Sequence, residues 1–296
     1  MARGDLVILP TETVYGLAAD AANPAAVARL YAAKERPRFN PLIAHVMDLA
    51  AAARFAALDE RARTLADAFW PGPLTIVAPI ADPAAVCDLA RAGLGTVAVR
   101  APAHVLARAV LARFGRPIVA PSANRSGRPS PTTLAVALAE TGEAAAAALD
   151  GGPCAVGIES TVIALLDGPP RLLRPGAVTR AEIEALIGRL AEAEADARRS
   201  PGRLARHYAP AAPLRLDAEE PADGEAFLAF GPGPAGPRVF QLSAAGDLAE
   251  AAANLFALLR AADSTGPRAI AVAPIPDEGL GEAINDRLRR AAGFIG

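Results

Sequence analysis

The chain has 296 residues and 52% of them are hydrophobic, which is enough to build two domains with sizeable cores. Its formal net charge is −2, and residues 1–190 carry 19 basic against 17 acidic side chains, which excludes a protein that binds nucleic acid through bulk charge alone. The two cysteines, Cys87 and Cys154, form no CxxC pair, so neither a disulfide framework nor a cysteine metal site is expected.

The N-terminal segment has no apolar stretch behind a basic start, and the sequence has no run of about 18 uncharged apolar residues. We therefore expect a soluble, cytoplasmic protein that does not enter a membrane.

Strands and helices are predicted to alternate over residues 1–190, which is typical of an α/β domain. The runs with strand character are 5–9, 42–46, 74–78, 96–100, 117–121, 160–166 and 171–174. The helix-like runs are 24–33, 59–69, 83–91, 103–113, 132–139 and 179–196. Asn23 and Pro24 provide an N-cap and a first-turn proline for the first helix. The last two strands meet through a short Gly-Pro turn, so we expect a hairpin and a mixed sheet.

Residues 191–213 change in character, because a charged helix end runs into Ser200-Pro201-Gly202 and then a Pro/Ala stretch. This pattern predicts an interdomain linker. A second, smaller α/β domain is expected over residues 214–296. Its strands are predicted near 214–216, 226–230, 238–242 and 269–273, and its helices near 246–262 and 279–292.

Several common sites are absent or unconvincing in the sequence. Residues 231–236 formally match GxGxxG, but a strand-like run follows them where a dinucleotide site needs a helix. There is no GxxxxGK[ST] motif, and three scattered histidines give no credible metal site from protein side chains.

A polar segment, residues 10–17, follows the first predicted strand. The carboxyl ends of strands are where α/β folds usually bind ligands, and the hydroxyls of Thr13 and Tyr15 can hydrogen-bond a small polar molecule. A capped loop with no ligand explains the same pattern equally well.

A dense cation cluster, Lys34, Arg36 and Arg38, lies at the predicted end of the first helix, ahead of an Asn40-Pro41 turn. Of the 30 basic residues, Lys34 is the only lysine, which suggests a position where arginine does not substitute. Such a cluster suits phosphate groups, although basic side chains also stabilise helix ends. His45, in the strand that follows, is by default a buried core histidine.

Residues 120–130 form a loop rich in hydroxyls and turn formers after the strand at 117–121. Ser130 and Pro131 are predicted to cap the next helix, whose N-terminal N–H groups could hold a phosphate. Arg100 and Arg174 each end a predicted strand, so they either converge on one anion or are solvated strand ends.

Eight motifs in a fixed order connect these segments. They are PTETVYGL (10–17), Lys34-x-Arg36 with NPL and His45, FWPGPLT (69–75), GTVAVR (95–100), PSAN (121–124), ESTV (159–162), LRPG (173–176) and HYAP (207–210). In this order they resemble the threonylcarbamoyl-AMP synthase family in its long two-domain form. The resemblance implies a YrdC-like twisted mixed sheet with flanking helices over residues 1–190. It also implies a linker that acts as an active-site lid over residues 191–213 and a Rossmann-like α/β accessory domain over residues 214–296.

The resemblance implies a nucleotidyltransferase that condenses L-threonine, bicarbonate and ATP, with Mg²⁺ accompanying the ATP. The product, threonylcarbamoyl-AMP, would pass to a threonylcarbamoyl transferase for N6-threonylcarbamoyladenosine modification of tRNA, and the enzyme could contact tRNA directly.

The resemblance also assigns roles to residues. The catalytic group would be Lys34, Arg36, Ser122 and Asn124. ATP would be bound by Arg36, Asn40, Thr96, Ser122, Ser130, Arg174 and Tyr208, and threonine by Thr13, His45, Arg100, Ala120 and Ser160. In this assignment the neutral imidazole of His45 recognises the threonine hydroxyl, and Tyr208 closes over the nucleotide.

Two alternatives share the expected fold. One is a non-catalytic module that binds double-stranded RNA on a concave basic face, which the near-neutral charge of residues 1–190 disfavours. The other is a carbamoyl-transfer domain of the hydrogenase-maturation type. Those proteins carry zinc-finger and acylphosphatase segments, which this sequence lacks.

Overall fold

Short apolar runs of the first 190 residues assemble into a large mixed sheet. The computed structural model describes residues 1–191 and 207–293, and within them nine strands follow the order β7-β1-β2-β6-β3-β5-β4-β8-β9. The strands are β1 (Leu6–Leu9), β2 (Gly16–Asp20), β3 (Ile43–His45), β4 (Leu74–Pro79), β5 (Thr96–Arg100), β6 (Ile118–Val119), β7 (Ala145–Ala148), β8 (Thr161–Ala164) and β9 (Arg171–Arg174). Three pairs are parallel, β1 with β7, β3 with β5 and β4 with β8, and the other pairs are antiparallel. The expected mixed sheet, with its β8–β9 hairpin, is confirmed.

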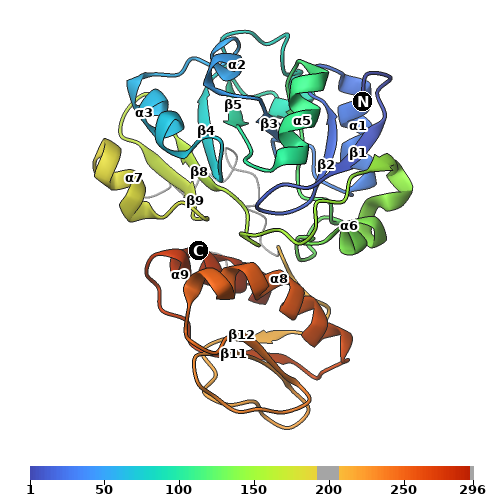
Figure 1. Cartoon of the computed structure of the whole chain (residues 1–296), viewed down its shortest axis with the longest axis vertical. Coiled ribbons are helices and arrows are strands. Elements are labelled where there is room, and N and C mark those ends of the chain that lie inside the picture. The colour runs from blue at the N-terminus through green and yellow to red at the C-terminus, as the bar shows by residue number, and fades with distance from the viewer. Residues whose placement is uncertain (192–206, 294–296) are drawn as a thin grey trace.

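Helices cover both faces of this sheet (Figure 1). They are α1 (Pro24–Ala33), α2 (Leu49–Ala53), α3 (Glu60–Phe69), α4 (Asp88–Arg91), α5 (Val105–Phe114), α6 (Leu134–Thr141) and α7 (Arg180–Ile187), with a 3₁₀ turn at Gly142–Ala144. Because side chains alternate along a strand, β2 sends Leu17 into the main core with α1 and α3, while its neighbour Ala18 packs with Leu111 of α5 on the other face.

The first helix begins and ends where the sequence predicts. Oδ1 of Asn23 accepts hydrogen bonds from the N–H groups of Ala25 and Ala26 at 3.0 and 3.1 Å, and α1 ends at Ala33. The predicted helix cap at Ser130 is wrong. Helix α6 begins at Leu134, and Thr133 caps it through a bond from the Val136 N–H.

The C-terminal residues form a smaller parallel sheet in the order β10-β13-β11-β12. Its strands are β10 (Leu214–Arg215), β11 (Ala226–Phe230), β12 (Val239–Ser243) and β13 (Ile270–Val272), and its helices are α8 (Leu248–Ser264) and α9 (Leu280–Ala292). The parallel strands, with α8 connecting β12 to β13, confirm the Rossmann-like prediction. Both helices lie on the side of this sheet that faces the larger domain (Figure 1).

The two domains share one apolar cluster. Val14 and Ile158 of the large domain are buried in the cluster that contains Phe256 of α8. Where the two domains meet, Gly157 has φ +75°, and a Cβ at this position would lie 2.5 Å from Cα of Ala253. Only glycine allows this loop to touch α8 so closely.

The predicted linker is described only in part, because residues 192–206 lie outside the described residues. Its later part, from His207, packs against the large domain: the N–H of Ala209 donates to the carbonyl of Gly127 at 2.8 Å. Along 1–191 and 207–293, none of the helices has the length and apolar character needed to cross a membrane.

Candidate active site

A cleft opens where β3, β5 and β9 end and β8 begins, between the large domain and the described part of the linker. Its volume is about 530 Å³, including the part open to solvent. Nine predicted site residues line it: Thr13, Arg36, His45, Arg100, Ala120, Ser122, Ser160, Arg174 and Tyr208. Segments up to about 190 residues apart in the sequence therefore meet here.

Arg100 ends β5 and is held by three hydrogen bonds. Nε donates to the carbonyl of Gly72 at 3.1 Å, Nη1 donates to Oγ1 of Thr13 at 3.0 Å, and Nη2 donates to Oε1 of Glu12. A guanidinium carries five N–H groups, so one N–H remains on each terminal nitrogen. Two parallel N–H groups match the two oxygens of a carboxylate.

His45 ends β3 beside Arg100, its parallel partner in the sheet. Nδ1 lies 3.2 Å from the carbonyl of Ile43. Burial, and next the charge of Arg100, lower the pKa of His45 to about 3. The imidazole is therefore neutral at physiological pH, and one ring nitrogen can act as an acceptor.

Ser160 and Arg174 form a second polar group in the cleft. The guanidinium of Arg174 donates to the carbonyl of Ser160 from Nε at 3.1 Å and from Nη2 at 2.8 Å, and to its hydroxyl at 3.1 Å. The Ser160 hydroxyl also lies 2.8 Å from Oγ1 of Thr75. The neighbouring strands β8 and β9 thus fix Arg174 against Ser160.

Arg36 and Ser122 line the cleft from the loops after α1 and β6. Arg36 is half-buried and donates to the carbonyls of Asn40 and Pro41 at 3.2 and 3.0 Å. Burial lowers the pKa of Arg36 to about 10, so it remains a cation at neutral pH. With Arg100 and Arg174, it gives the cleft three cations.

Lys34 and Asn124 lie behind the cleft lining. Nζ of Lys34 donates to the carbonyls of Ser122 and Asn124, and the side chain is buried. The side chain of Asn124 donates to the carbonyls of Arg125 and Arg128 at 2.8 and 2.9 Å. In this structure both residues shape the loop that carries Ser122.

Three other predicted ATP contacts also lie outside the lining of the cleft. The hydroxyl of Ser130 donates to Oε1 of Glu159, and Asn40 supplies its carbonyl to Arg36 and Tyr31. Thr96 begins β5 whereas Arg100 ends it, so the two are about 13 Å apart on the same face of the strand.

Tyr208 and His207 close the cleft from the linker. Tyr208 is 1% exposed and stacks at a tilt on Phe256, with ring centroids 5.3 Å apart. Neither the Tyr208 hydroxyl nor Nδ1 of His207 has a hydrogen-bond partner among the described residues. Buried polar atoms without partners are costly, so these atoms are candidates for contacts with a bound ligand.

The sequence interpretation missed four residues of this site: Glu12, Thr75, Glu159 and His207. Each stands inside a motif that was identified, PTETVYGL, FWPGPLT, ESTV or HYAP. Their partners lie far away in the sequence, as with Glu12 and Arg100, so spacing alone does not reveal them.

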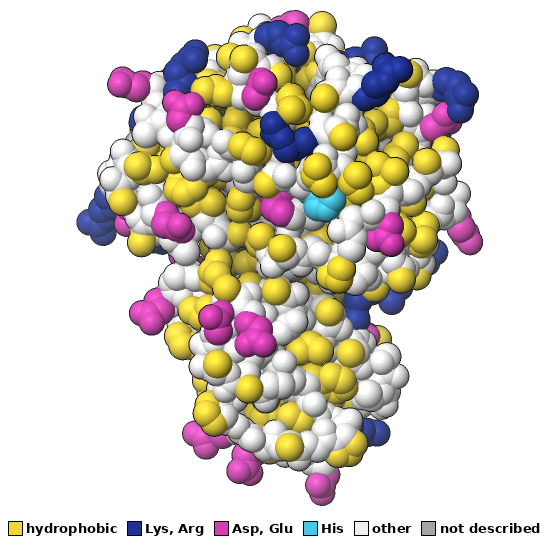
Figure 2. Space-filling view, viewed as in Figure 1, with side chains coloured by type: hydrophobic (Ala, Val, Ile, Leu, Met, Phe, Trp, Pro, Cys, Tyr) yellow, Lys and Arg dark blue, Asp and Glu magenta, His cyan; other side chains and the backbone are white. Residues whose placement is uncertain are grey.

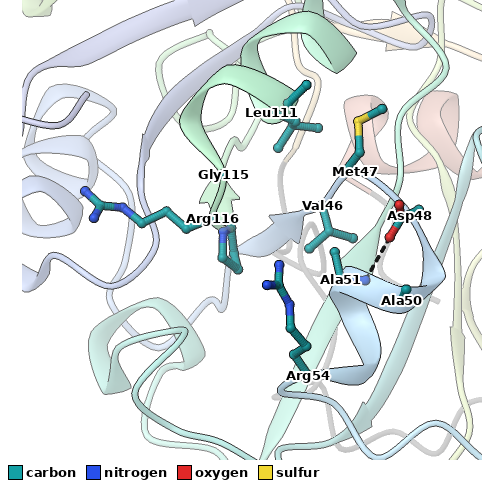
Figure 3. Close-up of a pocket in the computed structure, with 11 residues that line it drawn as sticks. Val46, Met47, Asp48, Ala50, Ala51, Arg54, Leu111, Gly115 and Arg116 are labelled. Carbon is teal, nitrogen blue, oxygen red and sulfur yellow. Dashed lines mark hydrogen bonds between the residues drawn. The ribbon is translucent and has the colours of Figure 1, made fainter.

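A second hollow lies between α2 and the end of α5 (Figure 3). It measures about 780 Å³, including the part open to solvent, and contains none of the predicted site residues. Its Arg116 already donates to Asp20 at 2.7 Å. The hollow therefore offers fewer groups for binding or catalysis than the cleft.

No group of three or more His, Cys, Asp or Glu that could hold a metal ion occurs within 1–191 and 207–293. On the face shown in Figure 2, basic and acidic side chains are interspersed and form no continuous basic patch. The cleft itself supplies cations and hydroxyls. These hydrogen-bond donors suit anions and a small polar molecule.

The fold and this cleft define an α/β protein of two domains, with a cation-lined cleft in the larger one. A family model for Sua5, YciO and YrdC proteins, described as telomere recombination, matches residues 1–176. A second model, described as the threonylcarbamoyl-AMP synthase C-terminal domain, matches residues 178–293.

Similar proteins identify the family within this class. The chain is 40% identical to the threonylcarbamoyl-AMP synthase of Pyrococcus abyssi, over 99% of this chain and 92% of the relative, and 39% identical to that of Bacillus subtilis, over 98% and 90%. The crystal structure of P. abyssi Sua5 complexed with L-threonine superposes with a TM-score of 0.91 at 38% identity, covering 99% of this chain and 92% of that one. The chain belongs to the threonylcarbamoyl-AMP synthase family. Membership favours a catalytic protein over the RNA-binding alternative.

Proposed function

We propose that the protein condenses L-threonine, bicarbonate and ATP into threonylcarbamoyl-AMP and pyrophosphate, which makes it a nucleotidyltransferase. The observation that carries the proposal is the cleft itself, whose lining brings Arg100 and His45 together with Arg36, Ser122 and Arg174. The first two suit an amino acid and the other three suit a polyphosphate.

Arg100 would bind the threonine carboxylate through its two remaining N–H groups. Thr13 and Glu12 hold the guanidinium in place for this contact. The neutral imidazole of His45 would accept a hydrogen bond from the threonine hydroxyl, with Ser160 and the Ala120 backbone completing the pocket. A site built around that hydroxyl rejects valine, because valine leaves the polar groups unpaired.

The chemistry proceeds in two steps. The threonine amine attacks the carbon of bicarbonate, a C–N bond forms, water leaves and N-carboxy-threonine remains. An oxygen of the newly formed N-carboxylate then attacks the α-phosphorus of ATP. The bond from this phosphorus to the β-phosphate oxygen breaks, and pyrophosphate leaves. Neither step needs a covalent bond to the protein, since phosphoryl transfer depends mostly on positioning and charge stabilisation.

Arg36, Arg174 and Ser122 would bind the triphosphate and hold the α-phosphate facing Ser160. Mg²⁺ would arrive bound to ATP oxygens and water, as it usually does where no cage of carboxylates exists. Tyr208 would close over the nucleotide, so that the linker acts as a lid.

The product would serve a cytoplasmic threonylcarbamoyl transferase that modifies adenosine in tRNA. A mixed carbamoyl–phosphoryl anhydride hydrolyses in water, which favours prompt transfer to that partner enzyme. Direct contact with tRNA would have to use local arginines, because the charge of residues 1–190 is near zero.

The deciding experiment is incorporation of labelled bicarbonate into a nucleotide product with ATP and threonine, compared with serine and valine. We expect label in threonylcarbamoyl-AMP with threonine, less with serine and none with valine. Pyrophosphate release without threonine and bicarbonate, or equal labelling with valine, would overturn the proposal.

A further inference from the structure

A buried arginine of the C-terminal domain reaches the back of the cleft. Arg287 lies in α9 and is 1% exposed, and its nearest acidic neighbours are Glu159 and Asp286, each 3.0 Å away. An arginine that is buried so fully must have its donors satisfied. Two of the residues that it bonds, Glu159 and Pro175, belong to the other domain.

Arg287 joins the two segments that carry Ser160 and Arg174. Nε donates to Oε2 of Glu159 at 3.0 Å, and Nη1 donates to the carbonyl of Pro175 at 2.6 Å. Glu159 immediately precedes Ser160, and Pro175 immediately follows Arg174. The guanidinium therefore bridges the neighbours of two cleft residues that are themselves hydrogen-bonded.

The segment that follows Arg174 packs directly against the backbone around Ser160. A Cβ on Gly176 would lie 2.3 Å from the nitrogen of Thr161 and 2.5 Å from the carbonyl carbon of Ser160. A displacement of Glu159 or Pro175 is therefore passed directly to Ser160 and Arg174.

The same guanidinium contacts the lid. It lies 5.6 Å from the ring centroid of Tyr208, within the range of a cation–π contact. Arg287 also sets the charge of Glu159: burial raises the pKa of this carboxyl, but the charges of Arg287 and then Arg174 bring it below its ordinary value. Ionised Glu159 then accepts the hydroxyl of Ser130 as well.

We propose that Arg287 is a positioning residue for the adenylation reaction, acting from the C-terminal domain through Glu159, Pro175 and Tyr208 on Ser160 and Arg174. This inference rests on the proposed function for its kinetic consequence. It gives the accessory domain a direct part in the geometry of the active site.

Other contacts hold the domains together without touching the cleft. Arg180 of α7 donates to Glu282 of α9 at 2.7 Å, and Arg260 of α8 donates to Glu140 of α6 at 2.8 Å. Glu282 lies on the same helix as Arg287, so Glu282→Gln is a matched control that weakens the interface and leaves the cleft alone.

The kinetic test compares Arg287→Met, Arg287→Lys and Glu282→Gln in the full chain, with label incorporation as the assay. We expect kcat/KM for threonine to fall about 100-fold in Arg287→Met, since a misplacement of about 1 Å costs that much. In Arg287→Lys, which keeps the charge but loses the planar set of guanidinium donors, kcat/KM should fall about 10-fold. Glu282→Gln should stay within twofold.

A double variant separates positioning from simple docking. Once Glu159→Gln has weakened the link, adding Arg287→Met should lower the rate by a further tenfold at most, whereas adding Glu282→Gln should leave it unchanged. If Arg287→Met keeps wild-type kinetics, or if it and Glu159→Gln multiply fully, the proposal is wrong.

Hydrogen exchange tests the proposal independently of activity. Amides of residues 158–161, Arg174 and Gly176 should exchange faster in Arg287→Met, or in Arg287→Lys if the methionine variant does not fold, and at the wild-type rate in Glu282→Gln. Equal exchange in all variants would overturn the positioning role. A wild-type protein that makes no adenylate would overturn the proposed function and leave this comparison intact.

Discussion

The carboxylate of Glu12 ties Arg100 to the backbone of the loop after β5. Its Oε1 accepts from Nη2 of Arg100, and its Oε2 accepts from the N–H of Ala103 at 3.0 Å. Burial raises the pKa of Glu12, but the charge and hydrogen bond of Arg100 lower it below its ordinary value. An ionised carboxylate thus holds the guanidinium that is proposed to bind threonine.

Replacing Glu12 by glutamine should weaken the orientation of Arg100 and raise KM for threonine about tenfold, a loss of roughly 1.4 kcal/mol. KM for ATP should stay within twofold, because Arg36 and Arg174 do not contact Glu12. Steady-state kinetics with each substrate varied in turn checks this. Equal rises in both constants would contradict a role limited to threonine.

Lys34→Met should lower the free energy of unfolding by about 2 kcal/mol, because the carbonyls of Ser122 and Asn124 lose their donor inside the protein. Adenylate formation should fall with it, while threonine binding, measured by calorimetry, should remain. Urea unfolding provides the stability.

Arg38→Met is the control for Lys34, since Arg38 belongs to the same cation cluster and is exposed. It should leave stability within 0.5 kcal/mol, as is roughly usual for surface changes. Full stability combined with lost ATP affinity in Lys34→Met would mean that the ammonium acts directly on phosphate, as the sequence resemblance implies.

His45 should make the protein less stable in mild acid. Its folded pKa of about 3 lies below the ordinary value of 6.5, so the unfolded chain takes up a proton first as the pH falls. The stability is present above about pH 6.5 and is lost progressively towards pH 3, with about 2 kcal/mol gone at pH 5.

Urea unfolding of the wild type and His45→Gln at pH 7.5 and pH 5 isolates this effect. The wild type should lose about 2 kcal/mol more than the variant between the two values. Because the pKa of His207 is also lowered by its burial, His207 adds to the acid sensitivity of both proteins and cancels in the difference. Equal losses would show that His45 is not held neutral.

Tyr208→Phe should stabilise the ligand-free protein and weaken ATP binding. The hydroxyl is buried without a partner among the described residues, so its removal should gain about 1 kcal/mol. If the hydroxyl binds the nucleotide, ATP affinity should fall about tenfold. Thermal unfolding with and without ATP measures both effects.

Tyr31→Phe provides the opposite case. The Tyr31 hydroxyl donates to the carbonyl of Asn40 at 2.9 Å, so its removal should destabilise the protein. A Tyr208→Phe protein that loses stability, or gains as much from ATP as the wild type, would remove the proposed nucleotide contact.

Local chemistry made much of the fold predictable. Helix α1 follows from Asn23 and Pro24, and the β-branched runs at 74–78 and 96–100 lie in the strands β4 and β5. The sequence prediction missed β2 and β7, whose residues GLAAD and AAAA have little strand preference. These strands form because neighbouring strands supply their hydrogen bonds, which a local pattern does not contain.

The candidate site was predictable where one strand end carries one functional side chain, as with Arg100 and Arg174. It was not predictable where two distant residues act together. Glu159 and Arg287 are 128 positions apart, and each alone is an ordinary charged residue. Pairing of that kind arises only when α9 docks on the large domain.

The contact of Gly157 with α8 limits how this protein can be recombined. A chimera that joins its C-terminal domain to the large domain of a relative would need a glycine at the position of Gly157, since any Cβ there would meet the backbone of Ala253. In domain exchange between relatives, the two domains should therefore be moved as one unit, together with the loop that separates them.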